Sequence, residues 1–350
     1  MIQKLPLSAI SRMKLEQHYI VAVKKIRRRA GLTVTNDSVF YPLVRSNRYY
    51  GNEFLLKKYS GADDFLYAII EHGLFFGNNK QKVGPKHEWE LGSILTYGDY
   101  RKELISRCFP EYFCETIGPL IHYASVDMQF LEELEKAFPQ KNRTMLFFPV
   151  HGSEAFSPVY DAEMAIRKIR KIADSRDCGN ILICVFGSAT DMYSGVVQKL
   201  GMGDRIRITT CGNRYSSDFL NRQKTMISFA DETISNSLGT HLGYCIYLGK
   251  PHVLLPQDFS YEGDRKELEK DFGTWNRSEN WASDFEKETA LFQKVFDEKY
   301  NYITEEQKEL CEYYWGFSKV KTPEEIREIY RKCRTFSESF VKKGGAGVRK

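Results

Sequence analysis

Several features that would mark a metal enzyme, an ATPase or a membrane protein are missing from this 350-residue sequence. It contains no Asp-x-Asp, no Gly-Lys-Ser phosphate loop and no Cys-x-x-Cys, and no two histidines have the helical spacing of a metal site. No apolar run reaches membrane-spanning length, and the N-terminus lacks a signal-peptide core. We therefore expect no metal, no cofactor and a cytoplasmic location.

Cysteine and basic residues are present, but their pattern is unspecific. Several of the eight cysteines lie inside apolar runs, as Cys184 and Cys245 do, which predicts reduced core residues. The densest basic run, 24–29, has neither zinc-finger spacing nor an RNA-binding aromatic signature, and the net charge is only +5. We expect a solvated helix face and no nucleic-acid partner; peripheral contact with anionic lipid stays open as a weaker option.

The length of the chain favours two domains. Short apolar segments in the first half alternate with helical patterns at 12–30 and 100–108, which weakly indicates βα units. These segments lie at 38–44, 65–73, 93–98 and 115–124. The polar stretch 140–143 marks a boundary, so we predict an acceptor-side α/β domain at 1–142. A helical segment is predicted at 279–342, with a disordered tail at 343–350.

The region 143–278 is easier to interpret. Apolar strands alternate with helical patterns, among them 159–173 and a serine-capped helix at 216–230. The predicted strands are 144–150, 180–187, 205–210, 232–236 and 251–256. This order predicts a parallel, doubly wound sheet, whose ligands bind beyond the carboxyl ends of the strands. The polar clusters "HGSE", "GSATD" and "SNSLGTH" all follow predicted strands.

The third of these clusters has the composition of a phosphate site. A helix N-terminus offers unpaired N–H groups and a partial positive charge, and Gly239 would let a ligand approach the backbone. Hydroxyl donors would come from Ser235, Ser237 and Thr240. The alternative is that Ser237 only caps a buried helix. The other two clusters supply three further candidate ligand groups, with helix capping as the alternative: His151, Ser153 and Ser188.

A candidate general base lies in the first half, where Glu71 and His72 end an apolar segment just before Gly73. A carboxylate or imidazole at a strand end beside a cleft can take a proton from a substrate. The alternative is a core histidine paired with Glu71. Because neighbours on a strand point to opposite faces, only one of the two should reach a substrate. We favour Glu71, since the chain turns away after His72.

The stretch "ADETISNSLGTHLGYCIYLGKPHVLL" resembles the donor domain of GT-B glycosyltransferases, above all bacterial enzymes of capsule, lipopolysaccharide and teichoic-acid synthesis. The segments "IEHGLFFG" and "IGPLIHYA" are similar to acceptor-domain segments, so the resemblance covers roughly 38–256. It implies two Rossmann-like domains with C-terminal helices crossing back over the cleft. The implied activity is metal-independent, inverting transfer from a nucleotide sugar to a surface-glycan acceptor. The cluster at 235–240 would hold the donor phosphate, assisted by His151 and Ser153, and Glu71 or His72 would deprotonate the acceptor.

One departure bears on the donor. Many uridine-nucleotide enzymes of this family carry a glutamate on the helix after the serine–glycine turn, whereas 240–250 contains no acidic residue here. A UDP-sugar and a CMP-linked acid sugar therefore both remain open. Two alternatives to glycosyl transfer also remain: a sugar-nucleotide epimerase on the same fold, and a non-catalytic partner in polysaccharide assembly.

Overall fold

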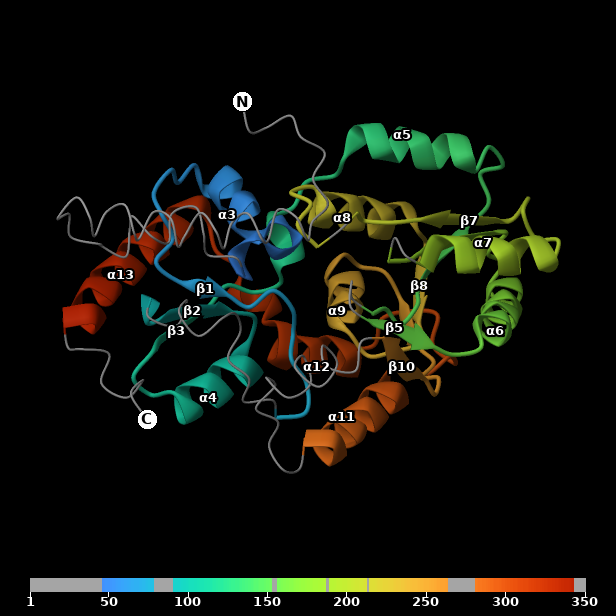
Figure 1. Ribbon diagram of the computed structural model, residues 1–350. Coiled ribbons are helices and arrows are strands. Elements are labelled where there is room, and N and C mark those ends of the chain that lie inside the picture. The colour runs from blue at the N-terminus through green and yellow to red at the C-terminus, as the bar shows by residue number, and fades with distance from the viewer. Residues whose placement is uncertain are drawn as a thin grey trace.

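The computed structural model describes residues 46–78, 91–152, 156–186, 189–212, 214–263 and 281–342. The predicted segments 12–30 and 38–44, the predicted disordered tail and two candidate site residues, Ser153 and Ser188, lie outside these ranges. Two parallel sheets, each with helices packed around it, organise the described chain (Figure 1).

The first unit is built on a small parallel sheet of three strands, in the order β1 (Ile69–Ile70), β2 (Ser93–Thr96), β3 (Phe113–Thr116). Its other elements are η1 (Ser46–Gly51), α3 (Asn52–Ser60), α4 (Asp99–Cys108) and η3 (Leu120–Tyr123). The predicted apolar segment at 115–124 is a strand only at its start. Gly118 takes a φ of 69° and Pro119 follows, so the chain turns out of the sheet.

The second unit contains a five-stranded parallel sheet in the order β7-β6-β4-β8-β9. Its strands are β4 (Thr144–Phe148), β6 (Asn180–Cys184), β7 (Ile206–Thr209), β8 (Glu232–Ser235) and β9 (His252–Leu254). Helices α6 (Ala162–Ser175), α7 (Thr190–Lys199), α8 (Phe219–Phe229) and α9 (Thr240–Tyr247) connect them. The strand order reverses between β4 and β8, and a doubly wound sheet binds ligands at such a reversal, beyond the carboxyl ends of its strands.

Two predicted helix starts in this unit are wrong. Residues 156–159 form β5 (Phe156–Val159), which pairs antiparallel with β10 (Ser260–Gly263), so α6 begins only at Ala162. Asp161 caps α6 by accepting the Met164 N–H at 2.8 Å. Helix α8 has Asp218, not a serine, at its N-cap position, with no side-chain capping bond there among the described residues.

The C-terminal helices return to the first unit, as predicted. They are α11 (Trp281–Val295), α12 (Glu305–Trp315), η5 (Phe317–Lys319) and α13 (Pro323–Lys342). Helix α13 packs on α3, β2 and β3, whereas α12 lies between α4 of the first unit and α9 of the second (Figure 1). Helix α5 (Met128–Ala137) precedes the predicted boundary at 142 yet packs on α8 of the second unit.

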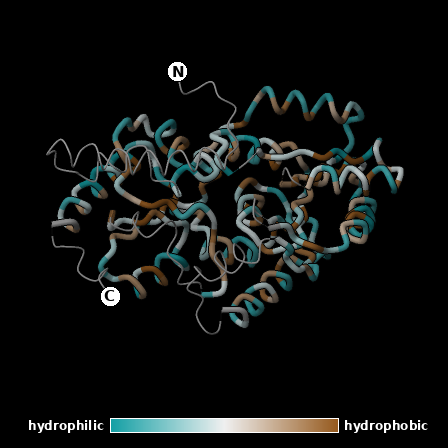
Figure 2. Tube along the Cα trace, in the orientation of Figure 1, coloured by the Kyte–Doolittle hydropathy of each residue, from teal (hydrophilic) through white to brown (hydrophobic). Residues whose placement is uncertain are grey.

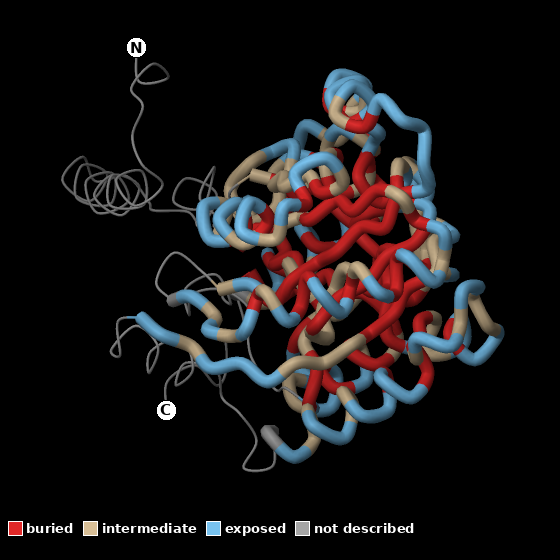
Figure 3. Tube along the Cα trace, turned by 90° about the vertical axis from the view of Figure 1, so that its right-hand side faces the viewer, coloured by how far each residue is buried: buried red, intermediate tan, exposed pale blue. Residues whose placement is uncertain are grey.

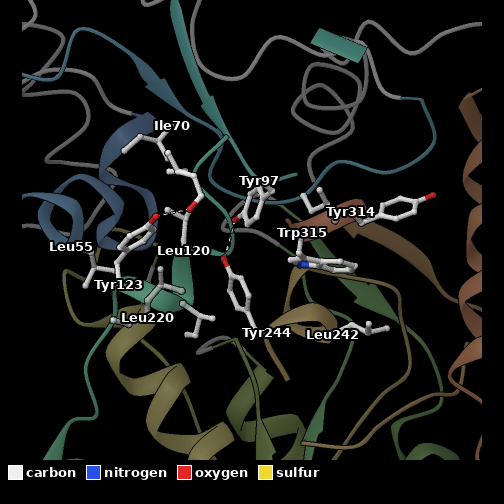
Figure 4. Packing of buried hydrophobic residues seen from close by; sticks show 14 of the residues in the cluster. Leu55, Ile70, Tyr97, Leu120, Tyr123, Leu220, Leu242, Tyr244, Tyr314 and Trp315 are labelled. Carbon is white, nitrogen blue, oxygen red and sulfur yellow. Dashed lines mark hydrogen bonds between the residues drawn. The ribbon is translucent and has the colours of Figure 1, made fainter. Parts of the chain in front are cut away.

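Hydrophobic residues are frequent along the strands and alternate with hydrophilic ones on the helices (Figure 2), and the strands lie buried under a more exposed shell (Figure 3). One apolar cluster runs through both units and includes Tyr97, Tyr244 and Trp315 (Figure 4). The Tyr97 and Tyr244 hydroxyls contact each other at 3.0 Å across the junction. A Cβ on Gly243 would come within 2.2 Å of the Trp315 ring, so glycine is required for α12 to pack here. The predicted α/β class with two Rossmann-like units is confirmed.

Candidate functional site

Asn236, the residue directly after β8, makes hydrogen bonds at the strand-order reversal of the five-stranded sheet. Its Oδ1 accepts the Val150 N–H beyond β4 at 2.6 Å, and its Nδ2 donates to Gln257 Oε1 at 3.2 Å. Asn236 is buried, so it joins the loops after β4, β8 and β9 into one structure. Sequence reasoning did not single out this residue, although an asparagine between two serines after a strand was the available signal.

Ser235 points into the protein interior. It is fully buried, its hydroxyl donates to Ser237 O at 3.0 Å, and His252 Nε2 lies 3.0 Å from the same oxygen. The other ring nitrogen of His252, Nδ1, lies 2.8 Å from the Thr233 hydroxyl oxygen, so the imidazole joins the two buried hydroxyls of β8. Burial, together with nearby His241, holds the pKa of His252 well below its usual range. The geometry therefore gives Ser235 a role in positioning the turn, and its hydroxyl does not face a ligand.

The N-cap of α9 is Gly239, so the alternative in which Ser237 is the N-cap is wrong. No side chain of the described residues caps this helix end, which leaves first-turn N–H groups for another partner. A Cβ on Gly239 would approach His241 Cε1 to 2.8 Å. The glycine thus makes room for a histidine ring, a reason that the sequence alone did not suggest. Ser237 is half-buried beside this helix end.

Thr240 joins three parts of the molecule at the start of α9. Its hydroxyl accepts the Leu74 N–H from the loop after β1 at 2.9 Å, and its carbonyl accepts the Trp315 indole N–H from α12 at 3.0 Å. Since the hydroxyl accepts one hydrogen bond, its own proton remains available to donate. The loop after β1 therefore reaches the N-terminus of α9 directly. The predicted donor-side and base-side residues are brought together here.

Glu71 at the end of β1 is buried in an ion pair. Arg101 Nη2 lies 2.5 Å from Oε1 and Arg101 Nε donates to Oε2 at 3.1 Å, while the Thr96 hydroxyl donates to Oε2 at 2.5 Å. Glu71 and Arg101 are 1% and 0% exposed, so neither oxygen of the carboxylate faces a substrate. The preference for Glu71 over His72 as the base has no support in this geometry. The alternative pairing of Glu71 with a histidine also differs from what is observed.

His72 is half-buried and surrounded by rings. Tyr49 lies 4.8 Å away between ring centroids, and Phe75 lies 5.7 Å away. Nδ1 of His72 is buried and has no hydrogen-bond partner among the described residues. Burial, and secondarily the Arg214 charge, lowers the pKa of His72 to about 4. The imidazole is thus neutral at pH 7. A buried nitrogen without a hydrogen-bond partner is uncommon in proteins, which makes Nδ1 of His72 a candidate for contact with a ligand.

The residues that cover His72 come from a turn with an unusual backbone. Tyr50 has a φ of 58°, and its N–H donates to Arg214 O in the second unit at 2.6 Å. A Cβ on the next residue, Gly51, would come within 2.5 Å of Ser217 O, so only glycine allows this approach. A bulky residue with positive φ is strained and is found where surrounding structure enforces it, often at functional sites. Sequence reasoning missed this turn; the signal was "YYG" before a helix.

Two further histidines lie near the strand reversal. His151 follows β4 and is exposed, with Nδ1 3.1 Å from Gly152 O. His241 stacks on Phe148 at 4.8 Å, and its Nε2 is buried without a hydrogen-bond partner among the described residues. Burial, with a contribution from His151, lowers the pKa of His241 to about 3. Both imidazoles border the same end of the sheet as Ser237.

The described residues contain no cluster of three or more His, Cys, Asp or Glu side chains that could hold a metal ion. Within the same part of the chain, no helix combines the length and the apolar character needed to cross a bilayer.

No family model matches the chain, and no curated protein sequence matches it significantly. Similar solved structures include the pneumococcal O-GlcNAc transferase GtfA in complex with UDP and GlcNAc, at 11% identity over 78% of this chain and 52% of that chain, with a TM-score of 0.35. The GtfA/B complex matches at 12% identity over 75% of this chain and 53% of that chain, with a TM-score of 0.32. HepE of Anabaena in complex with UDP and glucose matches at 11% over 70% of each chain, with a TM-score of 0.30.

The chain therefore spans about half the length of the two Gtf structures that it matches.

Proposed function

We propose that the protein is a glycosyltransferase that moves a sugar from a nucleotide-sugar donor to a glycan acceptor. One observation carries the proposal: the loop after β1, with His72, meets the uncapped N-terminus of α9 through the 2.9 Å bond from Leu74 N–H to the Thr240 hydroxyl. This contact lies at the carboxyl ends of both sheets, where α/β proteins bind substrates. The proposed anion site and the neutral imidazole, from different units, would thus lie close together.

The donor phosphate would bind at the N-terminus of α9. The unpaired N–H groups there and the helix dipole favour a negative charge. Ser237 and Thr240 would donate from their hydroxyls, and His151 would approach from the loop after β4. Ser153 and Ser188 keep their predicted roles as further donor ligands. The proposed transfer needs no metal ion, because these donors and the dipole would stabilise the leaving phosphate, and it should persist in excess EDTA.

His72, in preference to Glu71, would accept the proton of the acceptor hydroxyl. The acceptor oxygen forms a bond to the anomeric carbon, the bond from that carbon to the donor phosphate oxygen breaks, and the hydroxyl proton passes to the imidazole. Attack opposite the leaving phosphate inverts the anomeric configuration. A bound donor places negative charge near His72, which would raise its pKa from about 4 towards the range that suits a base at neutral pH.

Glu71 would support the same chemistry indirectly. Its two bonds to Arg101 hold the end of β1 in place, and His72 is the next residue. We propose a CMP-linked acid sugar or a UDP-sugar as the donor. Helix α9 carries no carboxylate of the kind that holds the ribose in many uridine-nucleotide enzymes, so both donors stay open. The acceptor would be a bacterial surface glycan, such as capsule or lipopolysaccharide. The protein would act in the cytoplasm and contact the membrane peripherally.

A thermal-shift screen with CMP, UDP, GDP and their sugars tests the proposal. A nucleotide at a hundred times its Kd should stabilise the protein by about 2.7 kcal/mol. Release of free nucleotide only when an acceptor glycan is present would support transfer. Conversion of the nucleotide sugar without any acceptor would identify an epimerase instead. If no nucleotide changes the melting temperature, the donor site is wrong and a non-catalytic role becomes the better explanation.

A further inference from the structure

Two cysteine sulfurs meet at the carboxyl edge of the five-stranded sheet. Cys184 is the last residue of β6, Cys211 lies two residues beyond β7, and their Sγ atoms are 3.6 Å apart. The strands are parallel neighbours, and the Val185 N–H donates to Thr209 O at 2.9 Å, so the backbones that carry the two thiols lie side by side. Both side chains belong to the apolar face shared with Leu182.

The two thiols differ in access. Cys184 is half-buried, whereas Cys211 is 3% exposed. Burial, and then the neighbouring Cys184 sulfur, raises the pKa of Cys211 well above its usual range. The Arg222 side chain from α8, whose Nε donates to Thr210 O at 3.3 Å, is the cation beside this pair. An external reagent would therefore reach Cys184 first, and Cys211 would act as the resolving thiol.

We propose that Cys184 and Cys211 form a reversible redox pair that a disulfide oxidant, such as oxidised glutathione, closes into an intramolecular disulfide. The Cys184 thiolate attacks one sulfur of oxidised glutathione, that S–S bond breaks, and one glutathione thiolate leaves. Cys211 then loses its proton to water and displaces the second glutathione. Two cysteine thiols are oxidised to one disulfide, and one oxidised glutathione is reduced to two thiols. The sulfurs need to approach from 3.6 Å to about 2.05 Å.

The cross-link would act next to the candidate site. The segment after Cys211 contains Arg214, whose carbonyl accepts the Tyr50 N–H and whose guanidinium lies over the Tyr49 ring at 5.6 Å. Tyr49 in turn contacts His72. Oxidation would join the ends of β6 and β7 just before this segment begins. The disulfide would form whether or not the protein transfers sugars, since it depends only on the two thiols and their neighbouring strands.

Thiol trapping tests the redox pair. The full chain is incubated with oxidised glutathione, alkylated under denaturing conditions, digested and analysed by mass spectrometry. We expect a peptide linked through Cys184 and Cys211, two fewer alkylated thiols, and full recovery of both after dithiothreitol. Cys114→Ser, which removes a half-buried thiol of β3, should behave as wild type. The linked peptide should be absent from Cys184→Ser and from Cys211→Ala.

A second readout guards against misfolded variants. Circular dichroism checks the fold of each variant, and oxidation should raise the melting temperature of the wild type but not that of Cys184→Ser, because a closed loop restricts the unfolded chain. Persistence of both cysteines as separately alkylated residues, or of Cys184 as a stable glutathione adduct with Cys211 still reduced, would overturn the proposal. The first result would show that Cys184 does not react with the oxidant, and the second that Cys211 cannot reach the mixed disulfide.

Discussion

The ends of β1 and β8, in different units, share one arrangement. At each end, one polar side chain points into the protein interior: Glu71 binds Arg101, and Ser235 contacts His252. In both cases a following residue stays at the junction, His72 in one unit and Ser237 in the other. The inward residues make fixed hydrogen bonds to buried partners, whereas the following ones are half-buried. At these strand ends, the residue that anchors the turn is therefore distinct from the one that can meet a ligand.

We expect the largest effect from His72→Phe, which should lower the turnover of sugar transfer. Phenylalanine keeps the ring contacts with Tyr49 and Phe75 but removes both nitrogens, so turnover should fall by about 10²–10⁴-fold, the usual contribution of a general base. Donor affinity should stay within about twofold, because the donor site is assigned to other residues. Turnover and nucleotide affinity are measured separately. His122→Phe, at a histidine that contacts the Tyr247 hydroxyl at 2.7 Å, is the control and should retain turnover.

Near-normal turnover in His72→Phe would remove His72 from the mechanism.

Glu71→Gln should act mainly on stability. The change leaves the Arg101 guanidinium buried without a compensating charge, which costs about 3–5 kcal/mol of unfolding free energy. Urea unfolding measures the loss. The matched control is Glu232→Gln. Glu232 is also buried, and it pairs with two arginines, Arg143 and Arg176. There the loss should be smaller, because Arg143 is 48% exposed and Arg176 also donates to backbone carbonyls.

Glu71→Gln also tests the earlier preference for Glu71 as the base. A rate loss of about 10²-fold or more in a variant of unchanged stability would restore that assignment.

Ser237→Ala and Ser235→Ala separate the two roles at the end of β8. Loss of a hydrogen bond to a charged phosphate should weaken nucleotide binding by about 1.5–3 kcal/mol in Ser237→Ala. Ser235→Ala should instead reduce stability by about 1–3 kcal/mol, because His252 Nε2 loses a buried partner, and leave binding nearly unchanged. Isothermal calorimetry and thermal unfolding distinguish these outcomes. The reverse pattern would place Ser235 in the donor site.

The smallest expected effect is on how the melting temperature falls as the pH is lowered. The pKa values of His72 and His241 are lowered to about 4 and about 3, while an unfolded histidine titrates near 6.5. Their contribution is fully present above about pH 6.5 and is lost as the pH falls towards the folded values, because the unfolded chain then binds more protons. The melting temperature of His241→Phe should fall less between about pH 7 and 5 than that of wild type. Parallel curves would contradict this expectation.

Much of the second unit could be predicted because its signals are local. Strands of 3–5 residues alternate with helices, and the five strands of the sheet lie where the sequence places them. Strands β4 and β6 are mostly apolar, as expected of strands buried on both faces, whereas β7 and β8 mix apolar and polar residues. The short strands of the first sheet were harder to bound: β1 contains only 2 residues, within an apolar stretch of 9. The start of α6 was missed because Val159, the first residue of the predicted helix, pairs with Ser260 between β5 and β10 instead.

The sequence by itself determined which residue types stand at the strand ends, and hence that an anion site and a base could lie at one edge. Only the tertiary structure decided which of them are already bonded to buried partners. Glu71 meets Arg101 across 30 positions, Ser235 meets His252 across 17, and the Leu74 N–H meets Thr240 across 166. Such partners are set by the order in which strands and helices pack. A spacing rule along one strand therefore cannot say whether a polar side chain is already occupied.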